Sequence, residues 1–311
     1  ELSNSAVVRA NDCICGYSIT YSNSLVMIKL IECPRDAMQG IKTFIPTAQK
    51  IKYLQSLLRC NFDVLDIGSF VSPKAIPQMR DTTEVLNGLD FSETTTELSV
   101  IVANERGAKE ACTFKQIRYL GFPFSISEIF QMRNTHKTIE ESFALLDSIQ
   151  GLCTSHDKEL VVYLSMGFGN PYGDPWNVAV VFHWIEQLAQ KGIRMISLSD
   201  TMGNADVSDI NELFSALIPH YQDIEFGAHF HCAPLEWKQK LEAAFSAGCK
   251  RFDTAIHGYG GCPMASNELV GNLPTEKAIS FFTAQKAKTT IDLFAFESAV
   301  NQANALFSQY A

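Results

Sequence analysis

The stretch from Ile28 to Gly40, IKLIECPRDAMQG, joins a short apolar run to a polar turn that carries two adjacent charges, Arg35 and Asp36. The apolar run predicts a strand over Ile28–Glu32, which ends before the proline. A doubly wound dinucleotide-binding sheet would place a G-x-G-x-x-G turn directly after this strand, and no such turn is present. The first strand therefore favours a different arrangement of parallel strands.

The same pattern, a short apolar run and then a longer amphipathic stretch, repeats along the chain. The runs predict eight strands, at Ile28–Glu32, Val64–Ile67, Leu98–Ala103, Ile117–Phe122, Leu160–Met166, Met195–Ser199, Ile224–His231 and Arg251–Ile256. Predicted helices between them include Pro46–Leu58, Ile139–Cys153, Pro175–Gln190, Val207–Leu217 and Leu235–Ala247. Eight strands alternating with helices indicate an α/β fold, and eight strands close a (β/α)8 TIM barrel. We predict such a barrel, with Thr275–Lys286 as its last helix and Thr290–Tyr310 as a C-terminal helical extension.

Composition excludes some classes of protein. The chain has 311 residues, is 46% hydrophobic and carries a net charge of −9, which suits a soluble globular protein large enough for one barrel. An acidic balance argues against a nucleic-acid partner, because binding phosphates requires a basic patch. No apolar run approaches the roughly 18 residues that would cross a membrane, so we expect no membrane partner.

The cysteines and the N-terminal segment bear on compartment and domain organisation. Nine cysteines form an odd set without a C-x-x-C pair, which is a poor framework for disulfides or zinc and indicates a reducing compartment. The first 26 residues are rich in Ser and Asn and lack a signal-peptide pattern. We expect residues 1–26 to be disordered or non-native and residues 27–311 to form one catalytic domain. A bacterial cytoplasmic protein is the simplest expectation, or a mitochondrial-matrix protein if the source is eukaryotic.

Two histidines near the end of the seventh predicted strand point to a metal site. His229 and His231 are two residues apart, so both side chains leave the same face of the strand, with their Cα atoms about 7 Å apart. A pair of hydrogen-bonded core histidines would give the same pattern. Asp36 would approach the same axis from the first strand. One Asp, two His and an amide carbonyl suit Mg²⁺ or Mn²⁺, and zinc ranks lower because no thiolate joins the set.

The Arg35-Asp36 pair has a plain alternative, an ion-paired surface turn. Its position at a strand exit favours a role in the site, because barrel chemistry is placed at the carboxyl ends of strands. A guanidinium offers forked donors that can stabilise the oxygen of a developing enolate.

Several separated motifs resemble those of the 3-hydroxy-3-methylglutaryl-CoA lyase family, within the metal-dependent TIM-barrel lyases and Claisen-type synthases. PRDAMQ, SFVSPKAIPQM, SLSDTMG and the GGCP…GN…TE pattern follow one another in the family's order, from Pro34 to Glu276. No single one of these motifs is specific, whereas their order and number are.

The resemblance implies a role for each matching position. The implied metal ligands are Asp36, His229, His231 and Asn272; the implied catalytic residues are Arg35, Gln39, Asp66, Asp200 and Cys262; and the implied substrate-binding residues are Ser69, Lys74 and Thr201. Arg35 would stabilise the enolate, and Cys262 would be a thiol on a mobile loop. The implied reaction is metal-dependent retro-Claisen cleavage of a carbon–carbon bond in 3-hydroxy-3-methylglutaryl-CoA, or a close 3-hydroxyacyl-CoA, which gives acetyl-CoA and acetoacetate. The implied assembly is a homodimer.

The chain departs from the family pattern in four places. The strand-seven motif reads HFHCAPLEW and loses an acid and a glycine, Asp66 replaces a glutamate, and Asn170 replaces a second cysteine. The stretch from Cys262 to Asn272 is one residue longer and contains Glu268. Three alternatives stay open: a condensing enzyme acting on a 2-oxo acid and acetyl-CoA, an aldolase acting on a 4-hydroxy-2-oxo acid, and a barrel that binds without catalysing.

Overall fold

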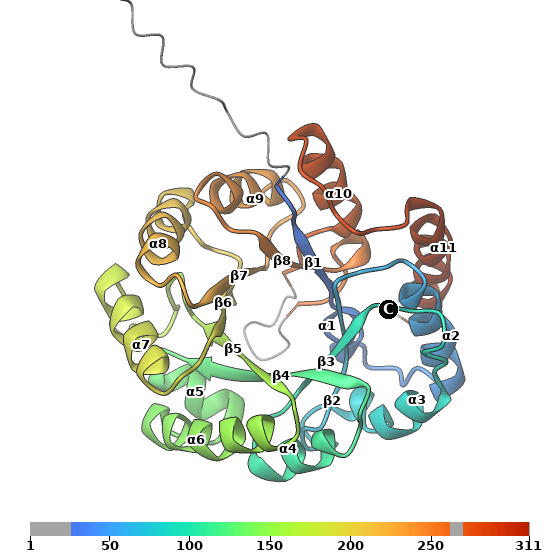
Figure 1. Ribbon diagram of the computed structural model, residues 1–311, viewed down its shortest axis with the longest axis horizontal. Coiled ribbons are helices and arrows are strands. Elements are labelled where there is room, and N and C mark those ends of the chain that lie inside the picture. Colours follow the sequence, from blue (N-terminus) through green and yellow to red (C-terminus); the bar gives the residue numbers. More distant parts are fainter. Residues whose placement is uncertain (1–25, 262–269, 311) are drawn as a thin grey trace, which may run out of the picture.

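Eight parallel strands close into a barrel that helices surround, which confirms the predicted TIM barrel (Figure 1). The computed structural model describes residues 26–261 and 270–310. The strands are β1 (Lys29–Glu32), β2 (Val64–Ser69), β3 (Glu97–Ile101), β4 (Ile117–Ser125), β5 (Glu159–Ser165), β6 (Met195–Asp200), β7 (Glu225–Phe230) and β8 (Arg251–Thr254). The barrel closes where β1 pairs with β8, with Leu30 opposite Phe252. The prediction for residues 1–26 falls outside the described residues, apart from Val26.

The helices lie between the strands and after the last one. They are α1 (Pro34–Gln39), α2 (Thr47–Leu58), α3 (Thr82–Gly88), α4 (Glu105–Cys112), α5 (Glu128–Thr135), α6 (Ile139–Ser155), α7 (Val178–Gln190), α8 (Val207–His220), α9 (Trp237–Ser246), α10 (Thr275–Ala284) and α11 (Leu293–Tyr310), with 3₁₀ turns η1 (Pro77–Met79) and η2 (Ile256–Gly258). Figure 1 shows the longer helices as an outer ring around the strands, whereas the short helix α1 lies inside that ring. No described helix is long and apolar enough to cross a membrane.

Successive side chains of each strand point to opposite faces of the sheet, and the apolar ones form two separate cores. Outward side chains such as Leu30, Leu65 and Leu198 pack against the helices in the large core. A smaller cluster, which includes Ile31 and Tyr163, fills the inside of the barrel. Because strand side chains alternate between faces, the same alternation decides which polar groups at the strand ends face the axis.

Several predicted element boundaries were wrong by a few residues, and local hydrogen bonds explain the differences. The predicted strand to His231 ends at Phe230, because His231 instead forms an isolated antiparallel bridge with Asn272. Helix α7 begins at Val178 rather than Pro175, because the Asn177 side chain accepts from the Val180 amide at 3.0 Å. Helix α11 begins at Leu293, because the preceding Asp292 carboxylate accepts from the amides of Phe294 and Ala295 at 2.9 and 3.0 Å.

The predicted C-terminal extension is the helix α11, which packs against α2. The Tyr53 and Phe307 rings meet edge to face at 5.9 Å between centroids, and Phe62 meets Phe296 at 6.1 Å. Phe307 also stacks on Tyr259 at 4.2 Å, just before the segment that carries Cys262. The extension therefore covers apolar side chains of the barrel wall.

Candidate active site

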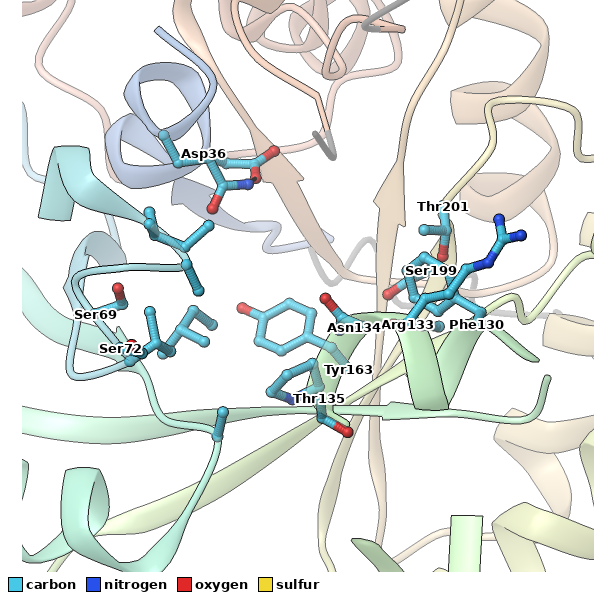
Figure 2. Close-up of a pocket in the computed structure, with 18 of the residues that line it drawn as sticks. Asp36, Ser69, Ser72, Phe130, Arg133, Asn134, Thr135, Tyr163, Ser199 and Thr201 are labelled. Atoms are coloured by element: carbon cyan, nitrogen blue, oxygen red, sulfur yellow. Dashed lines mark hydrogen bonds between the residues drawn. The ribbon is translucent and has the colours of Figure 1, made fainter. Parts of the chain in front are cut away.

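A cavity of about 420 Å³ opens at the carboxyl ends of the strands. Seven of the residues singled out from the sequence line it: Arg35, Asp36, Gln39, Ser69, Thr201, His229 and His231. Figure 2 shows Tyr163 in the middle of this cavity, with Asp36 on one side and Thr201 on the other. The position agrees with the general placement of chemistry in TIM barrels.

Three of these residues form a cluster that could hold a cation. One ligand atom each from Asp36, His229 and His231 lies within 4.8 Å of the others. The three residues are only 3%, 8% and 2% exposed. Asp36 Oδ2 and His231 Nδ1 are buried without a hydrogen-bond partner, so both are free to bind an ion. A carboxylate and two imidazoles fit Mg²⁺ or Mn²⁺, and the orphaned atoms are what such an ion would satisfy.

The local hydrogen bonds orient this cluster. Asp36 lies in α1, and its Oδ1 accepts from Arg35 Nη1 at 2.9 Å and from Gln39 Nε2, which leaves Oδ2 free. The Nδ1 atom of His229 is 3.0 Å from Oδ2 of Asp253 on β8. A carboxylate behind a metal-binding imidazole fixes the orientation of the ring, so Asp253 supports His229.

The electrostatics of the cluster prepare it for a cation. Burial acts to raise the pKa of Asp36, but the charge of Arg35 and the two imidazoles lower it below its ordinary value. Burial lowers the pKa of His231 to about 4, so this ring is neutral near pH 7. Burial also acts to lower the pKa of His229, but the hydrogen bond and charge of Asp253 raise it.

Cys33, His229 and Asp253 form a second group whose ligand atoms lie within 4.8 Å of one another. Here the imidazole and the carboxylate already hydrogen-bond each other. Burial raises the pKa of the Cys33 thiol well above its ordinary range, which keeps it protonated. This group is therefore a buried support beneath the first cluster.

Asn272 joins the first cluster from the far end of the segment that carries Cys262. Its side chain is buried, and Nδ2 donates to the Tyr259 carbonyl oxygen at 2.8 Å. The backbone bridge to His231 brings Asn272 beside the cluster. Cys262 and Glu268 themselves lie outside the described residues.

Nearly all N–H groups of the Arg35 guanidinium donate to acceptors within the protein. Nε and Nη2 donate to Asp66 Oδ2 at 3.0 and 2.6 Å, and Nη1 donates to Gln39 Oε1 at 2.9 Å as well as to Asp36. Burial acts to raise the pKa of Asp66, and Arg35 opposes it. Asp66 does not line the cavity, so the structure places it beneath Arg35, where it fixes the guanidinium rather than facing a substrate.

Asp200, the last residue of β6, and Thr201, which follows it, have different surroundings. Thr201 lines the cavity, and its hydroxyl accepts from the Met166 amide at 2.9 Å. The Asp200 side chain instead points away from the cavity and accepts from Lys240 Nζ at 2.7 Å. Sequence reasoning missed Lys240, although its place three residues after Trp237 and four before Ala244 puts it on the buried face of α9.

Other predicted residues fall outside the cavity. Lys74 is exposed on the segment after β2 and does not line it, whereas Ser69 does. Asn170 shapes a turn, because its Oδ1 accepts from the amides of Tyr172 and Asp174 at 3.0 and 3.2 Å. Lining residues that sequence reasoning missed include Tyr163 of β5 and a group in and just after α5, namely Phe130, Arg133, Asn134, Thr135, His136 and Lys137.

Comparison with known proteins agrees with this architecture. The chain matches the HMGL-like family over residues 28–302. It is 30% identical to the hydroxymethylglutaryl-CoA lyase of Bacillus subtilis over 268 residues, which cover 84% of this chain and 86% of that protein. It is 28% identical to the 3-hydroxy-3-isohexenylglutaryl-CoA/hydroxy-methylglutaryl-CoA lyase of Pseudomonas aeruginosa, covering 88% and 90%. An HMG-CoA lyase from Acinetobacter baumannii, in complex with coenzyme A and 3-methylmalate, superposes with a TM-score of 0.83 at 29% identity, covering 91% and 92%.

Proposed function

The chain belongs to the HMGL-like family, and from this premise we propose that it cleaves 3-hydroxy-3-methylglutaryl-CoA, or a close 3-hydroxyacyl-CoA, in a reaction that depends on a divalent metal. The observation that carries the proposal is the buried cluster of Asp36, His229 and His231 beside Arg35, which lines the cavity and has two unpartnered ligand atoms. The products from 3-hydroxy-3-methylglutaryl-CoA would be acetoacetate and acetyl-CoA.

Asp36, His229, His231 and Asn272 would hold Mg²⁺ or Mn²⁺. A bound divalent ion of this kind acidifies the C3 hydroxyl and polarises a carbonyl oxygen. Gln39 and Asp36 accept hydrogen bonds from Arg35 Nη1 and hold the side chain in place, so the guanidinium is already oriented before the reaction. Such preorganised donors are worth more than mobile ones, because they need not reorganise as charge develops.

Cleavage requires two proton movements around one bond. The C3 hydroxyl gives its proton to a base, such as a water molecule, the C2–C3 bond breaks, and its electron pair becomes the enolate of acetyl-CoA while C3 becomes the ketone of acetoacetate. The proton taken by the base balances the one that C2 then receives. The remaining N–H of Arg35 Nη2 would donate to the enolate oxygen. An acid must then protonate C2, and we assign that role to the thiol of Cys262 on the basis of the family resemblance.

The test is acetoacetate release from 3-hydroxy-3-methylglutaryl-CoA by the purified, metal-free protein before and after addition of Mn²⁺ or Mg²⁺. We expect turnover only with metal and at least 100-fold less in Cys262→Ala. Cys112→Ala is the matched control, because this buried thiol of α4 does not line the cavity. A panel with larger C3 substituents measures substrate range.

Two results would count against the proposal. Equal turnover in Cys262→Ala and the unchanged protein would show that the Cys262 thiol is not the acid that protonates C2. If metal raises the thermal stability of the protein but no acyl-CoA in the panel is cleaved at its C2–C3 bond, the protein is better described as a binding protein. The homodimer is a separate expectation that light scattering tests.

A further inference from the structure

Lys240 is a buried cation beside the cluster, and no step of the proposed reaction uses it. It is 2% exposed, and its Nζ donates to Asp200 Oδ2 at 2.7 Å, to the Gly203 carbonyl at 2.7 Å and to the His231 carbonyl at 3.2 Å. An ammonium has three N–H donors, so each is used once. Lys240 therefore connects α9 to the ends of both β6 and β7.

The acceptors belong to the backbone that carries the proposed metal ligands. The His231 carbonyl is part of a proposed ligand residue, and its amide donates to the Asp200 carbonyl at 3.3 Å. One residue later, the Cys232 amide donates to the Gly271 carbonyl at 2.8 Å, beside Asn272. The three-way contact of Lys240 thus holds the strand end against which Asn272 is placed.

The turn after β6 is fixed by the same contact. Asp200 also accepts from the amides of Asn204 and Ala205 at 3.0 and 3.1 Å, and Gly203 has a positive φ of +72°. A Cβ on Gly203 would lie 2.6 Å from the Val270 side chain, so this turn packs directly against the segment that leads to Asn272. A shift of the turn would be transmitted to that segment because the two are in contact.

We propose that Lys240 is a positioning residue that sets the geometry in which His231 and Asn272 meet a divalent cation. The inference rests on the metal centre of the proposed function. Without the ammonium, the buried Asp200 carboxylate keeps two amide donors but loses its countercharge, and two carbonyl oxygens lose a donor. The turn and the His231 carbonyl then have to move or admit water, which displaces the adjacent ligands.

A second buried ion pair provides a matched control. Lys50 of α2 is also 2% exposed and donates to Asp81 Oδ1 at 2.6 Å and to the Gln78 carbonyl, but it does not line the cavity. Lys50→Met and Lys240→Met remove the same group in the same kind of environment. Both should lower the thermal stability of the protein, so a loss of stability alone does not distinguish a positioning role.

The decisive measurement is the Kd of Mn²⁺ for the metal-free full chain, followed by electron paramagnetic resonance or calorimetry. We expect Kd to rise at least 10-fold in Lys240→Met, as for other groups that orient metal ligands, and to stay within threefold in Lys50→Met. In the lyase assay, kcat should fall in Lys240→Met with little change in KM.

Unchanged Mn²⁺ affinity in Lys240→Met, with the same loss of stability as in Lys50→Met, would overturn the inference and leave the proposed function intact. Failure of the unchanged protein to bind Mn²⁺ would instead overturn the proposed metal centre, and the inference with it. If Lys240→Met does not fold, Lys240→Gln keeps two N–H donors without the charge and is judged by the same Mn²⁺ criterion.

Discussion

Replacement of Glu32 by glutamine should remove a pH dependence that this carboxyl group gives to the stability of the barrel. Glu32 ends β1 with a fully buried side chain. Its Oε1 accepts from the Ile256 amide at 2.8 Å, and its Oε2 pairs with the Thr275 hydroxyl at 2.6 Å. These partners precede and follow the segment that carries Cys262, so Glu32 ties the two ends of that segment together.

The size of the effect follows from the shifted pKa. Burial raises the pKa of Glu32 from 4.5 to about 8, and the hydrogen bonds from Thr275 and Ile256 oppose the shift only in part. Between these two values the folded protein holds a proton that the unfolded chain has released. The stability that Glu32 contributes is therefore complete below pH 4.5 and is lost as the pH rises through 8. At about 1.4 kcal/mol per pH unit, the loss between pH 5 and 7.5 is about 3 kcal/mol.

Glutamine keeps the shape and neutrality of the protonated side chain but does not titrate. From pH 5 to 7.5 the free energy of unfolding of Glu32→Gln should thus fall by about 3 kcal/mol less than that of the unchanged protein. The neighbouring Tyr53 and Cys60 do not contribute, because burial raises the pKa of Tyr53 well above this range and that of Cys60 to about 12.

The measurement is denaturant unfolding at several pH values in EDTA, followed by circular dichroism. Glu297→Gln, an exposed substitution on α11, should keep the pH dependence of the unchanged protein. Parallel pH profiles for Glu32→Gln and the unchanged protein would show that Glu32 is ionised in the folded state, and the reasoning from its burial would fail.

Three further substitutions test the site directly. Asp36→Asn should raise the Kd of Mn²⁺ more than 100-fold and abolish cleavage, because it removes the one anion of the proposed ligand set; calorimetry and the acetoacetate assay measure the two effects. Arg35→Lys should lower kcat about 10²- to 10³-fold with a smaller change in KM, since the point charge of lysine cannot replace the forked guanidinium held by Asp66. Steady-state kinetics in which KM rises by as large a factor as kcat falls would contradict this. Asp253→Ala should raise the Kd of Mn²⁺ about 10- to 100-fold by freeing the His229 ring, and an unchanged affinity would count against its supporting role.

Alternation of apolar runs with amphipathic stretches was sufficient to predict the barrel, because each βα unit leaves its own local pattern. The same local logic predicted that His229 and His231 face one site, because residues two apart on a strand share a face. The strand ends at Phe230, and the bridge to Asn272 continues the extended backbone to His231. Arg35 and Asp36 were likewise predictable from their position at a strand exit. Asn272 was assigned only through the family resemblance, because nothing local marks an amide that returns to the site from the far end of a loop.

The supporting residues could not be predicted in the same way. Asp253 is 24 positions from His229, and only the β7–β8 register places the two residues opposite each other. Lys240 meets Asp200 across 40 positions, through the packing of α9 against the end of β6. Asp66 was assigned to catalysis because the sequence gives its strand but not the Arg35 side chain that covers it. Long-range contacts of this kind are set by tertiary packing and leave no spacing rule in the sequence.

The stacking of Phe307 on Tyr259 bears on how far this protein could be minimised by engineering. Eight βα units suffice to define the barrel topology, so the terminal helix looks dispensable in a truncation series or as a site for fusing a second protein. Yet the carbonyl oxygen of Tyr259 accepts a hydrogen bond from the side-chain amide of Asn272, and Phe307 of α11 stacks on the Tyr259 ring. A protein shortened before α11 would thus keep the barrel and lose the packing that supports one proposed metal ligand, Asn272. Fused segments are best placed beyond the last turn of α11.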